Sequence, residues 1–375
     1  MKIVFTGGGS GGHFYPIIAV AEKIRDIARD EHLLEPELYF LGPDKYDEKA
    51  LFELGIKFKK VSAGKMRRYF SILNFFDLFK TAWGIIKGMF NVFSIFPDVI
   101  FSKGGYGSFP VVLAAKVLRI PLIIHESDSV PGAVNAWAGK FAQKIAVSFS
   151  DAENFFPKDK VALTGNPIIK DILSPSKSGA MEFLKLENGI PVIFVIGGSL
   201  GSRLMNDIIL EALPQLIQKY QIIHQTGEGN LKDVEKIAST QLSESKYKNR
   251  YRPFGYLNSL AMKMSAGVAD LVISRAGSTI FQIAAWGLPS IIIPITNSNG
   301  DHQRKNAFNY ASTGAAIVIE ENNFSDEILL AQIEEIMGNS QKRILMGNLA
   351  KDYAKTDAAE KIAKEIIHLA LEHEK

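Results

Sequence analysis

The 375-residue sequence contains no cysteine, and this absence removes several kinds of chemistry at once. Disulfide bonds, thiolate metal sites and cysteine nucleophiles are all excluded. The absence also fits a reducing compartment such as the cytoplasm.

The sequence also has little charge imbalance and no long apolar run. Forty-three Lys and Arg residues against forty Asp and Glu residues give a net charge of +3, which is too mild to indicate nucleic acid as a partner. No run of about 18 apolar residues occurs, so no membrane-spanning helix is expected. The chain opens on the strand-like run KIVFT without a basic and then apolar leader, so secretion is not expected either.

Two strand-to-helix junctions, about half the chain apart, have nearly the same glycine-rich turn. In the first, KIVFT (2–6) leads into GGGSGGH (7–13), and in the second, VIFVI (192–196) leads into GGSLGS (197–202). Glycines at such a turn let the backbone approach a ligand, and the helix that follows offers N–H groups and a positive end to a phosphate. The pair therefore indicates two nucleotide-binding folds.

Short apolar strands alternate with helical stretches throughout the chain, as in parallel sheets with helices on both faces. A chain of 375 residues exceeds what one core usually serves, and Gly165-Asn166-Pro167 is the candidate boundary. We expect an α/β fold of two doubly wound Rossmann-like domains facing a central cleft, over residues 1–165 and 166–351. A C-terminal helix, about 352–375, could pack back on the first domain. Besides the two strands above, strands are expected at 38–41, 98–101, 121–124, 145–148, 221–224, 270–273, 290–294 and 316–319.

The stretch from Lys65 to Phe96 combines aromatic side chains with cations. It holds seven of the 24 phenylalanines, and Asp77 is its only acidic residue. Rings at the acyl boundary and cations at the headgroups suit the plane of an anionic bilayer. The alternative is a core helix covered by long basic side chains. We predict contact with an anionic membrane surface.

The first glycine turn satisfies G-x-G-x-x-G, yet no acid stands at the tip of the second strand, where a dinucleotide site needs one. His13 occupies the position of the lysine in a phosphate-binding loop. At a helix N-terminus the cationic imidazole is disfavoured, so His13 can stay neutral and accept a proton, unless it only caps its turn. His125-Glu126-Ser127-Asp128 ends another strand. Glu126 is the candidate there for proton chemistry or for orienting a base, whereas His125 fits a structural role at least as well.

In the second half, the turn Ser274–Thr279 lies between a strand and a helix and forms a second phosphate cradle. Gln282, one helical turn later, could reach a ribose. The loop at residues 297–303 is dense in amides and hydroxyls, which suits the many hydroxyl groups of a sugar.

Together these motifs resemble the bacterial family 28 glycosyltransferases that add N-acetylglucosamine to lipid I, the undecaprenyl-linked muramyl-pentapeptide, to form lipid II for peptidoglycan. The resemblance covers almost the whole chain, in the order GGGSGGHFYP, KGGYGSFP, HESDSVPGAVN, GNP, GGSLGS, SRAGS and DHQRKNA. It implies the two-domain GT-B fold, no cofactor and a peripheral position on the cytoplasmic face of the cell membrane. No Asp-x-Asp metal motif is evident, so no metal is expected.

The resemblance also assigns roles to residues. The second domain would bind the donor UDP-N-acetylglucosamine, and the first would bind the lipid diphosphate. His13 or Glu126 would be the base when the acceptor's 4-hydroxyl displaces UDP with inversion. The implied acceptor-side contacts are Ser10, Gly11, Gly12 and Tyr106. The implied donor-side contacts are Asp128, Ser199 and the SRAGS turn with Ser278 and Thr279 for the diphosphate, Gln282 for the ribose, His302 and Gln303 for the sugar, and the chain near Tyr256 for the uracil.

Four positions depart from the family pattern, and they cluster around the donor. Asp128 replaces an amide, Leu200 a glutamine, Ile169 an arginine and Gln282 a glutamate. Three alternatives therefore stay open. They are a sister UDP-sugar glycosyltransferase with another glycolipid acceptor, a UDP-sugar 2-epimerase, and a catalytically weakened binding protein.

Overall fold

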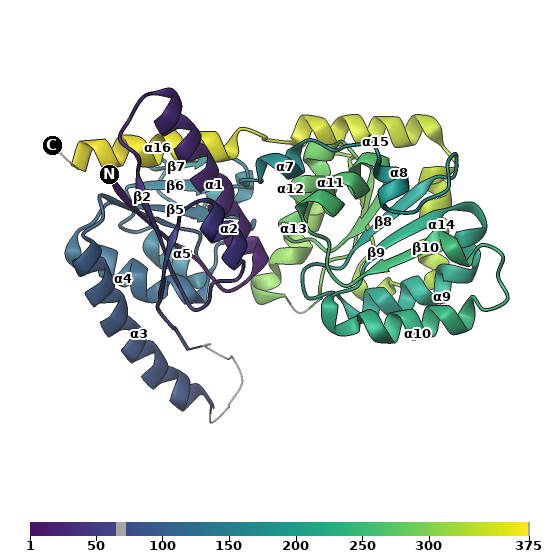
Figure 1. The fold of residues 1–375 in the computed structure, drawn as a ribbon, viewed down its shortest axis with the longest axis horizontal. Coiled ribbons are helices and arrows are strands. Elements are labelled where there is room, and N and C mark those ends of the chain that lie inside the picture. The colour runs from purple at the N-terminus through teal and green to yellow at the C-terminus, as the bar shows by residue number, and fades with distance from the viewer. Residues whose placement is uncertain (65–72, 297, 374–375) are drawn as a thin grey trace. The chain divides into compact units, whose positions relative to one another are not determined.

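The computed structural model describes residues 1–64, 73–296 and 298–373, and the chain forms two compact domains (Figure 1). The first comprises Met1–Ile169 together with Lys355–Lys375, and the second comprises Lys170–Ala354. The second domain is therefore a continuous insertion into the first.

The first domain is built on a parallel sheet of seven strands within the described residues, in the order β3-β2-β1-β4-β5-β6-β7. β1 pairs with both β2 and β4, so Ile3 lies opposite Leu38 on one side and Val99 on the other. The strands are β1 Lys2–Thr6, β2 Glu37–Gly42, β3 Lys57–Lys60, β4 Val99–Ser102, β5 Leu122–Glu126, β6 Lys144–Val147 and β7 Val161–Leu163.

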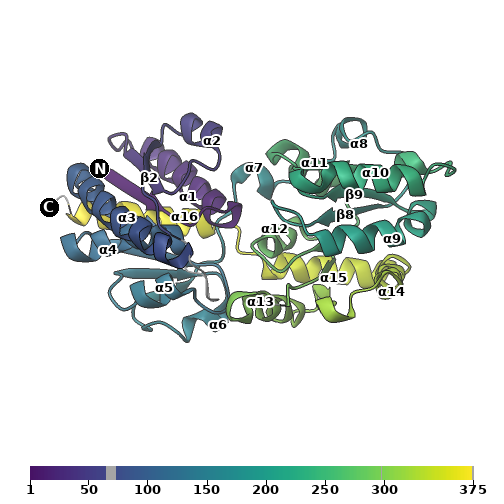
Figure 2. The same ribbon diagram turned by 90° about the horizontal axis from the view of Figure 1, so that it is seen from below.

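Side chains alternate between the two faces of the sheet along each strand, so both faces have apolar side chains that helices cover. Val4 and Ile100 belong to a buried cluster with residues of α3 and α4, which pack together. On the other face, Phe5 and Phe101 meet edge to face at 6.2 Å. α16 lies along α1 in Figures 1 and 2 and also contacts β4. The helices are α1 Gly11–Asp30, α2 Glu48–Glu53, α3 Leu73–Ile95, η1 Tyr106–Ser108, α4 Phe109–Leu118, α5 Ala133–Ala138, α6 Ser150–Glu153 and α16 Ala358–His373.

The second domain repeats this plan, and its described residues form six parallel strands in the order β10-β9-β8-β11-β12-β13. Its strands are β8 Val192–Ile196, β9 Gln221–Gln225, β10 Tyr251–Phe254, β11 Leu271–Ser274, β12 Ser290–Ile292 and β13 Ala316–Val318. Its helices are α7 Lys170–Leu173, α8 Ala180–Phe183, α9 Arg203–Lys219, η2 Glu228–Asn230, α10 Leu231–Gln241, η3 Lys248–Arg250, α11 Ser259–Val268, α12 Thr279–Trp286, η4 Asn299–Asp301, α13 His302–Ala311, η5 Glu321–Asn323, α14 Asp326–Met337 and α15 Ser340–Tyr353.

The predicted α/β class with two Rossmann-like domains is confirmed. Three strands were not predicted, namely β3, β7 and β10, and each of them lies at the edge of its sheet. Among the described helices, none combines the length and the apolar character needed to cross a bilayer.

Candidate functional site

Each sheet has one point at which the order of its strands reverses, and both points carry a glycine-rich turn. In the first domain this point lies between β1 and β4, and in the second between β8 and β11. Open parallel sheets bind ligands at the carboxyl ends of the strands at such a point. The two turns singled out in the sequence therefore lie where a sheet of this kind would bind a ligand.

In the first domain, the turn after β1 packs directly on the loop after β4. The Gly8 N–H donates to the Gly104 carbonyl at 3.0 Å. Gly105 has a φ of 77°, and a Cβ added there would lie 2.9 Å from His13 Nε2. Only glycine allows the backbone to pass this close to the His13 ring with a positive φ. Tyr106, which begins η1, is half-buried beside it in the sequence.

His13 is the third residue of α1, one turn after the exposed Ser10 that precedes the helix. Its Nδ1 lies 2.7 Å from Ser10 Oγ. When Nδ1 holds the proton and donates to that hydroxyl, Nε2 has the lone pair that a base needs. Gly11 and Gly12 complete the first turn of the helix, and Gly11 is buried with Tyr46 Oη 2.7 Å from where its Cβ would be.

Glu126, the other candidate base, is buried at the end of β5 and organises its own loop. Oε1 accepts from the Asp128 N–H, and Oε2 accepts from the Gly132 N–H and from Asn135 Nδ2, each at 3.0 Å. Burial and the nearby Asp128 raise the pKa of this carboxyl. Because both oxygens already accept hydrogen bonds, the geometry favours Glu126 for holding the loop that contains the half-buried Asp128.

Two further charged or ionisable residues lie under this loop, and the sequence reasoning missed one of them. His125 is fully buried, and its Nε2 bonds to the Gly165 carbonyl at 3.0 Å, in line with a structural role. Lys103, directly after β4, is 1% exposed, and its Nζ has no hydrogen-bond partner among the described residues. Burial lowers the pKa of Lys103 to about 8 although Glu126 and Asp128 oppose the shift. A lysine between a buried strand and a Gly-Gly pair was the available signal.

In the second domain, the turn Gly197–Ser202 is held from β9. Gln225 Nε2 donates to the Gly198 carbonyl at 3.0 Å, while Gln225 Oε1 accepts from the Leu257 N–H at 3.2 Å. This side chain connects the glycine turn to the segment after β10, where Tyr256 is 38% exposed. Ser199 and Leu200 are exposed at the tip of the turn.

The turn after β11 and the loop after β12 hold the remaining donor candidates. Ser278 precedes α12 without capping it through its side chain, and Thr279 and Gln282 lie half-buried in the first turn of that helix. His302 begins α13. Gln303 braces the loop, since its Oε1 accepts from the Ile295 N–H at 3.1 Å and its own N–H donates to Ser298 Oγ at 3.1 Å.

Asn297 of this loop lies outside the described residues, as does 65–72 of the predicted membrane-facing stretch. Within the part of the chain that is described, no group of three or more His, Cys, Asp or Glu side chains is arranged to hold a metal ion.

Comparison with known proteins matches both halves of the chain. Residues 3–147 match the glycosyltransferase family 28 N-terminal domain, and residues 192–366 match its C-terminal domain. A Bacillus cereus protein named UDP-N-acetylglucosamine–N-acetylmuramyl-(pentapeptide) pyrophosphoryl-undecaprenol N-acetylglucosamine transferase 2 is 38% identical over 345 residues, covering 91% of this chain and 93% of the relative. A Clostridium novyi protein of the same name, without the number, is also 38% identical, over 92% of each chain.

Solved structures share the fold. The crystal structure of Acinetobacter baumannii MurG has a TM-score of 0.71 at 24% identity, over 98% of this chain and 99% of that one. A UDP-GlcNAc 2-epimerase from Neisseria meningitidis, bound to UDP-GlcNAc, has a TM-score of 0.69 at 15% identity, over 98% of this chain and 100% of that one.

Proposed function

This chain belongs to glycosyltransferase family 28, and we propose that it transfers N-acetylglucosamine from UDP-N-acetylglucosamine to the 4-hydroxyl of lipid I, forming lipid II. The observation that carries the proposal is the similarity of almost the whole chain to curated relatives that are named for this reaction. The two glycine turns at the strand-order reversals give each substrate diphosphate a place to bind.

In the proposed reaction the acceptor's 4-hydroxyl attacks the anomeric carbon as the bond to UDP breaks, which inverts that carbon. His13 Nε2 takes the hydroxyl proton, with Nδ1–H held by Ser10. Glu126 keeps the loop with Asp128 in place and is not the base. The N-termini of α9 and α12 stabilise the charge of the leaving diphosphate.

The donor sits on the second domain in this proposal. Ser199 binds the diphosphate near the start of α9, and Ser278 and Thr279 bind it at the start of α12. Gln282 bonds the ribose as a neutral acceptor, which is weaker than a glutamate. His302 and Gln303 meet the sugar, and the segment at Tyr256 meets the uracil.

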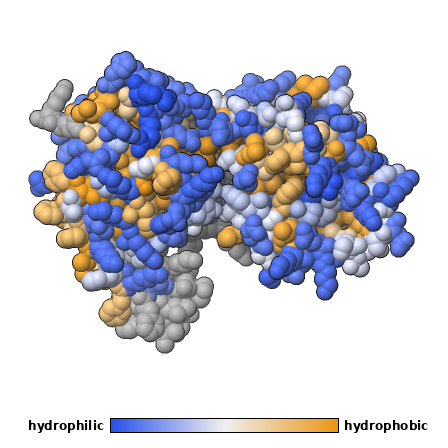
Figure 3. Space-filling view, viewed as in Figure 1, coloured by the Kyte–Doolittle hydropathy of each residue, from blue (hydrophilic) through white to orange (hydrophobic). Residues whose placement is uncertain are grey.

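We also propose that the protein is peripheral to the cytoplasmic face of the cell membrane and binds it through α3. The α3 stripe consists of Phe79, Trp83, Ile86, Phe90 and Phe93, spaced three or four residues apart, and each is between 58% and 70% exposed. Figure 3 shows hydrophobic residues gathered over this helix. An exposed apolar row of this kind is typical of an interaction surface.

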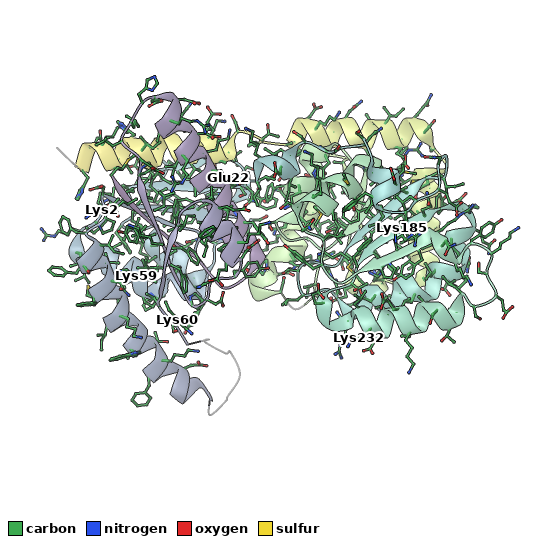
Figure 4. The ribbon with its side chains drawn as sticks, in the orientation of Figure 1. Lys2, Glu22, Lys59, Lys60, Lys185 and Lys232 are labelled. Carbon is green, nitrogen blue, oxygen red and sulfur yellow. The ribbon has the colours of Figure 1, made fainter. Side chains whose placement is uncertain are left out.

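Cations border the α3 stripe, as an anionic bilayer requires. Lys80 and Lys87 lie on α3 and are exposed. Lys59 and Lys60 end β3, where Figure 4 labels them, and the segment that follows reaches α3 through the bond from the Gly64 N–H to Thr81 Oγ1 at 3.0 Å. The opposite side of α3 packs on α4.

The test of the reaction uses the purified protein, UDP-N-acetylglucosamine and a lipid I analogue, with disaccharide product and UDP both measured. Stoichiometric disaccharide and UDP are expected. Turnover only with another UDP-sugar or another glycolipid would favour a sister enzyme. UDP release without an acceptor would indicate epimerase or hydrolase chemistry, and UDP-sugar binding without turnover a weakened binding protein.

His13→Ala tests the base. We expect kcat to fall by at least about 100-fold, because a positioned base contributes roughly 10²–10⁴, while the dissociation constant of UDP changes less than about twofold. His32→Ala, at an exposed histidine of the same domain, is the matched control. A loss confined to donor affinity would contradict the assignment of the base.

A further inference from the structure

Arg275 lies directly after β11, within the turn expected to face the donor's diphosphate, yet the two terminal nitrogens of its guanidinium are bonded to the protein. The residue is 8% exposed. Its Nη1 donates to the Ile293 carbonyl at 3.1 Å. Its Nη2 donates to Ser202 Oγ at 2.6 Å and to Glu321 Oε1 at 2.7 Å. Both terminal nitrogens therefore already have protein acceptors.

These bonds join loops from four neighbouring strands. Ser202 ends the second glycine turn and caps α9 by accepting from the Met205 N–H. Ile293 follows β12, and Glu321 begins η5 after β13. The second carboxylate oxygen of Glu321 accepts from the Thr296 N–H at 2.9 Å, at the start of the loop that leads to His302 and Gln303.

The Arg275–Glu321 pair is largely removed from water, with side chains 9% and 19% exposed. Burial lowers the pKa of Arg275 and Glu321 opposes that shift, whereas the Thr296 N–H and Arg275 lower the pKa of Glu321 in spite of its burial. The contact between the two groups therefore favours the charged form of each, against the effect of burial. Only a planar guanidinium can reach a carboxylate, a hydroxyl and a carbonyl at once, and removing one member of such a pair leaves the other charge uncompensated.

We propose that Arg275 and Glu321 are positioning residues for the donor site, which hold the Ser202 helix cap and the Thr296 loop in place and do not bind the phosphates themselves. This inference rests on the proposed donor site of the second domain. It assigns the phosphate contacts of the SRAGS turn to Ser278, Thr279 and backbone N–H groups. The arginine supplies the connection between the phosphate side of the site and its sugar side.

Glu321→Gln separates this role from direct phosphate binding, because the two predict opposite signs. If Arg275 bound the diphosphate, removal of the competing carboxylate would free the guanidinium and tighten UDP binding. A positioning pair predicts that UDP and UDP-N-acetylglucosamine bind about tenfold or more weakly, since the lost bonds are charge-assisted. Calorimetry with UDP and the KM for each substrate give the readout.

Four further variants complete the experiment. Arg275→Lys keeps the charge but loses the forked guanidinium, and it is expected to weaken donor binding as Glu321→Gln does. The double variant Arg275→Lys with Glu321→Gln is expected to bind the donor no more weakly than either single variant. Glu321→Asp keeps the charge but shortens the reach, and weakened binding is again expected. Glu320→Gln is the matched control, because the neighbouring Glu320–Arg304 pair is exposed, and no change is expected.

In every variant the KM for the lipid acceptor and the far-ultraviolet circular dichroism are expected to match the parent. Unchanged or tighter UDP binding in Glu321→Gln would overturn the inference, and so would additive effects in the double variant. If the parent protein binds UDP but does not glycosylate lipid I, only the proposed acceptor is contradicted. A parent that glycosylates lipid I, with variants that bind UDP normally, would contradict this inference alone.

Discussion

At the scale of single residues, Lys103 has a buried ammonium group that water does not reach. It lies under the loops of the proposed acceptor site. It is 1% exposed, and Glu126 and Asp128 are the carboxylates that act on it. Glu126 is itself engaged by three N–H donors. The charge of Lys103 is therefore only partly compensated, and the folded domain bears a cost for keeping it protonated.

Lys103→Met tests this cost through its pH dependence. Burial lowers the pKa of Lys103 from 10.5 to about 8, so the unfolded chain binds more protons between these values and the folding contribution of Lys103 improves as pH rises through them. Relative to Lys103→Met, the parent is expected to gain about 2 kcal/mol in free energy of unfolding between about pH 7.5 and 9.5. Urea unfolding of both proteins at each pH provides the measurement. A difference that does not change with pH would contradict the buried charge.

Sequence reasoning selected candidate residues, which stay predictions, but it could not describe their partners. His13, Glu126 and Ser199 were found because each follows an apolar strand, and the carboxyl ends of parallel strands meet at one edge. That Glu126 organises a loop and that Arg275 is bonded to Glu321, 46 residues away in the chain, depends on how distant segments pack. Spacing in the sequence holds no signal for such contacts.

At the scale of elements, α3 has two unlike sides. Gly84 and Gly88 are buried, and a Cβ at Gly84 would lie 1.8 Å from the Ser62 carbonyl oxygen, so glycine allows the helix to pack closely there. The α3 stripe faces away from this contact and is exposed. The alternative interpretation of this segment, a core helix covered by long basic side chains, would not leave an exposed row of apolar side chains.

Phe90→Ser combined with Phe93→Ser is expected to weaken binding to vesicles that contain anionic phospholipid by at least about tenfold, because two rings are lost from the proposed interfacial face. Vesicle sedimentation measures the bound fraction. Phe52→Ser is the matched control, at a phenylalanine of α2 that is 84% exposed. Binding equal to that of the parent would contradict the membrane assignment. Raising the salt concentration should weaken binding of the parent, since its cations contribute.

The three strands that were not predicted, β3, β7 and β10, were missed for one physical reason. β3 (KFKK) and β7 are short and flank their sheet, and β10 (YRPF) tolerates Pro253 because an edge strand can omit a hydrogen-bond donor. Central strands are buried on both faces and read as continuous apolar runs. Edge strands need no such run, so periodicity alone does not reveal them.

At the scale of the whole molecule, the two domains repeat one plan with different contents. Both place a glycine turn at the strand-order reversal, followed by a long helix, yet only the first carries a histidine in that helix start. The exposed α3 stripe also belongs to the first domain alone. These differences support the proposed assignment of the acceptor to the first domain and of the donor to the second.

Hydrogen exchange with and without UDP tests this division. Protection by UDP is expected to concentrate in the second domain, in peptides that contain residues 197–202, 275–282 and 253–257, because those backbone groups are proposed to meet the nucleotide. Exchange in the segment 7–13 is expected to change less. Protection of that segment with none in the second domain would contradict the assignment of the donor.

The insertion of the second domain into the first has a consequence for the order of synthesis on the ribosome. α16 packs on α1, and its Ile362, Ile366 and Ala370 are buried in the finished domain. The ribosome must complete all of Lys170–Ala354 before it makes α16, which takes roughly 10–40 s at ~5–20 residues per second. During that interval the side of α1 that α16 covers is exposed to solvent, and so the domain that begins first is the one that finishes last.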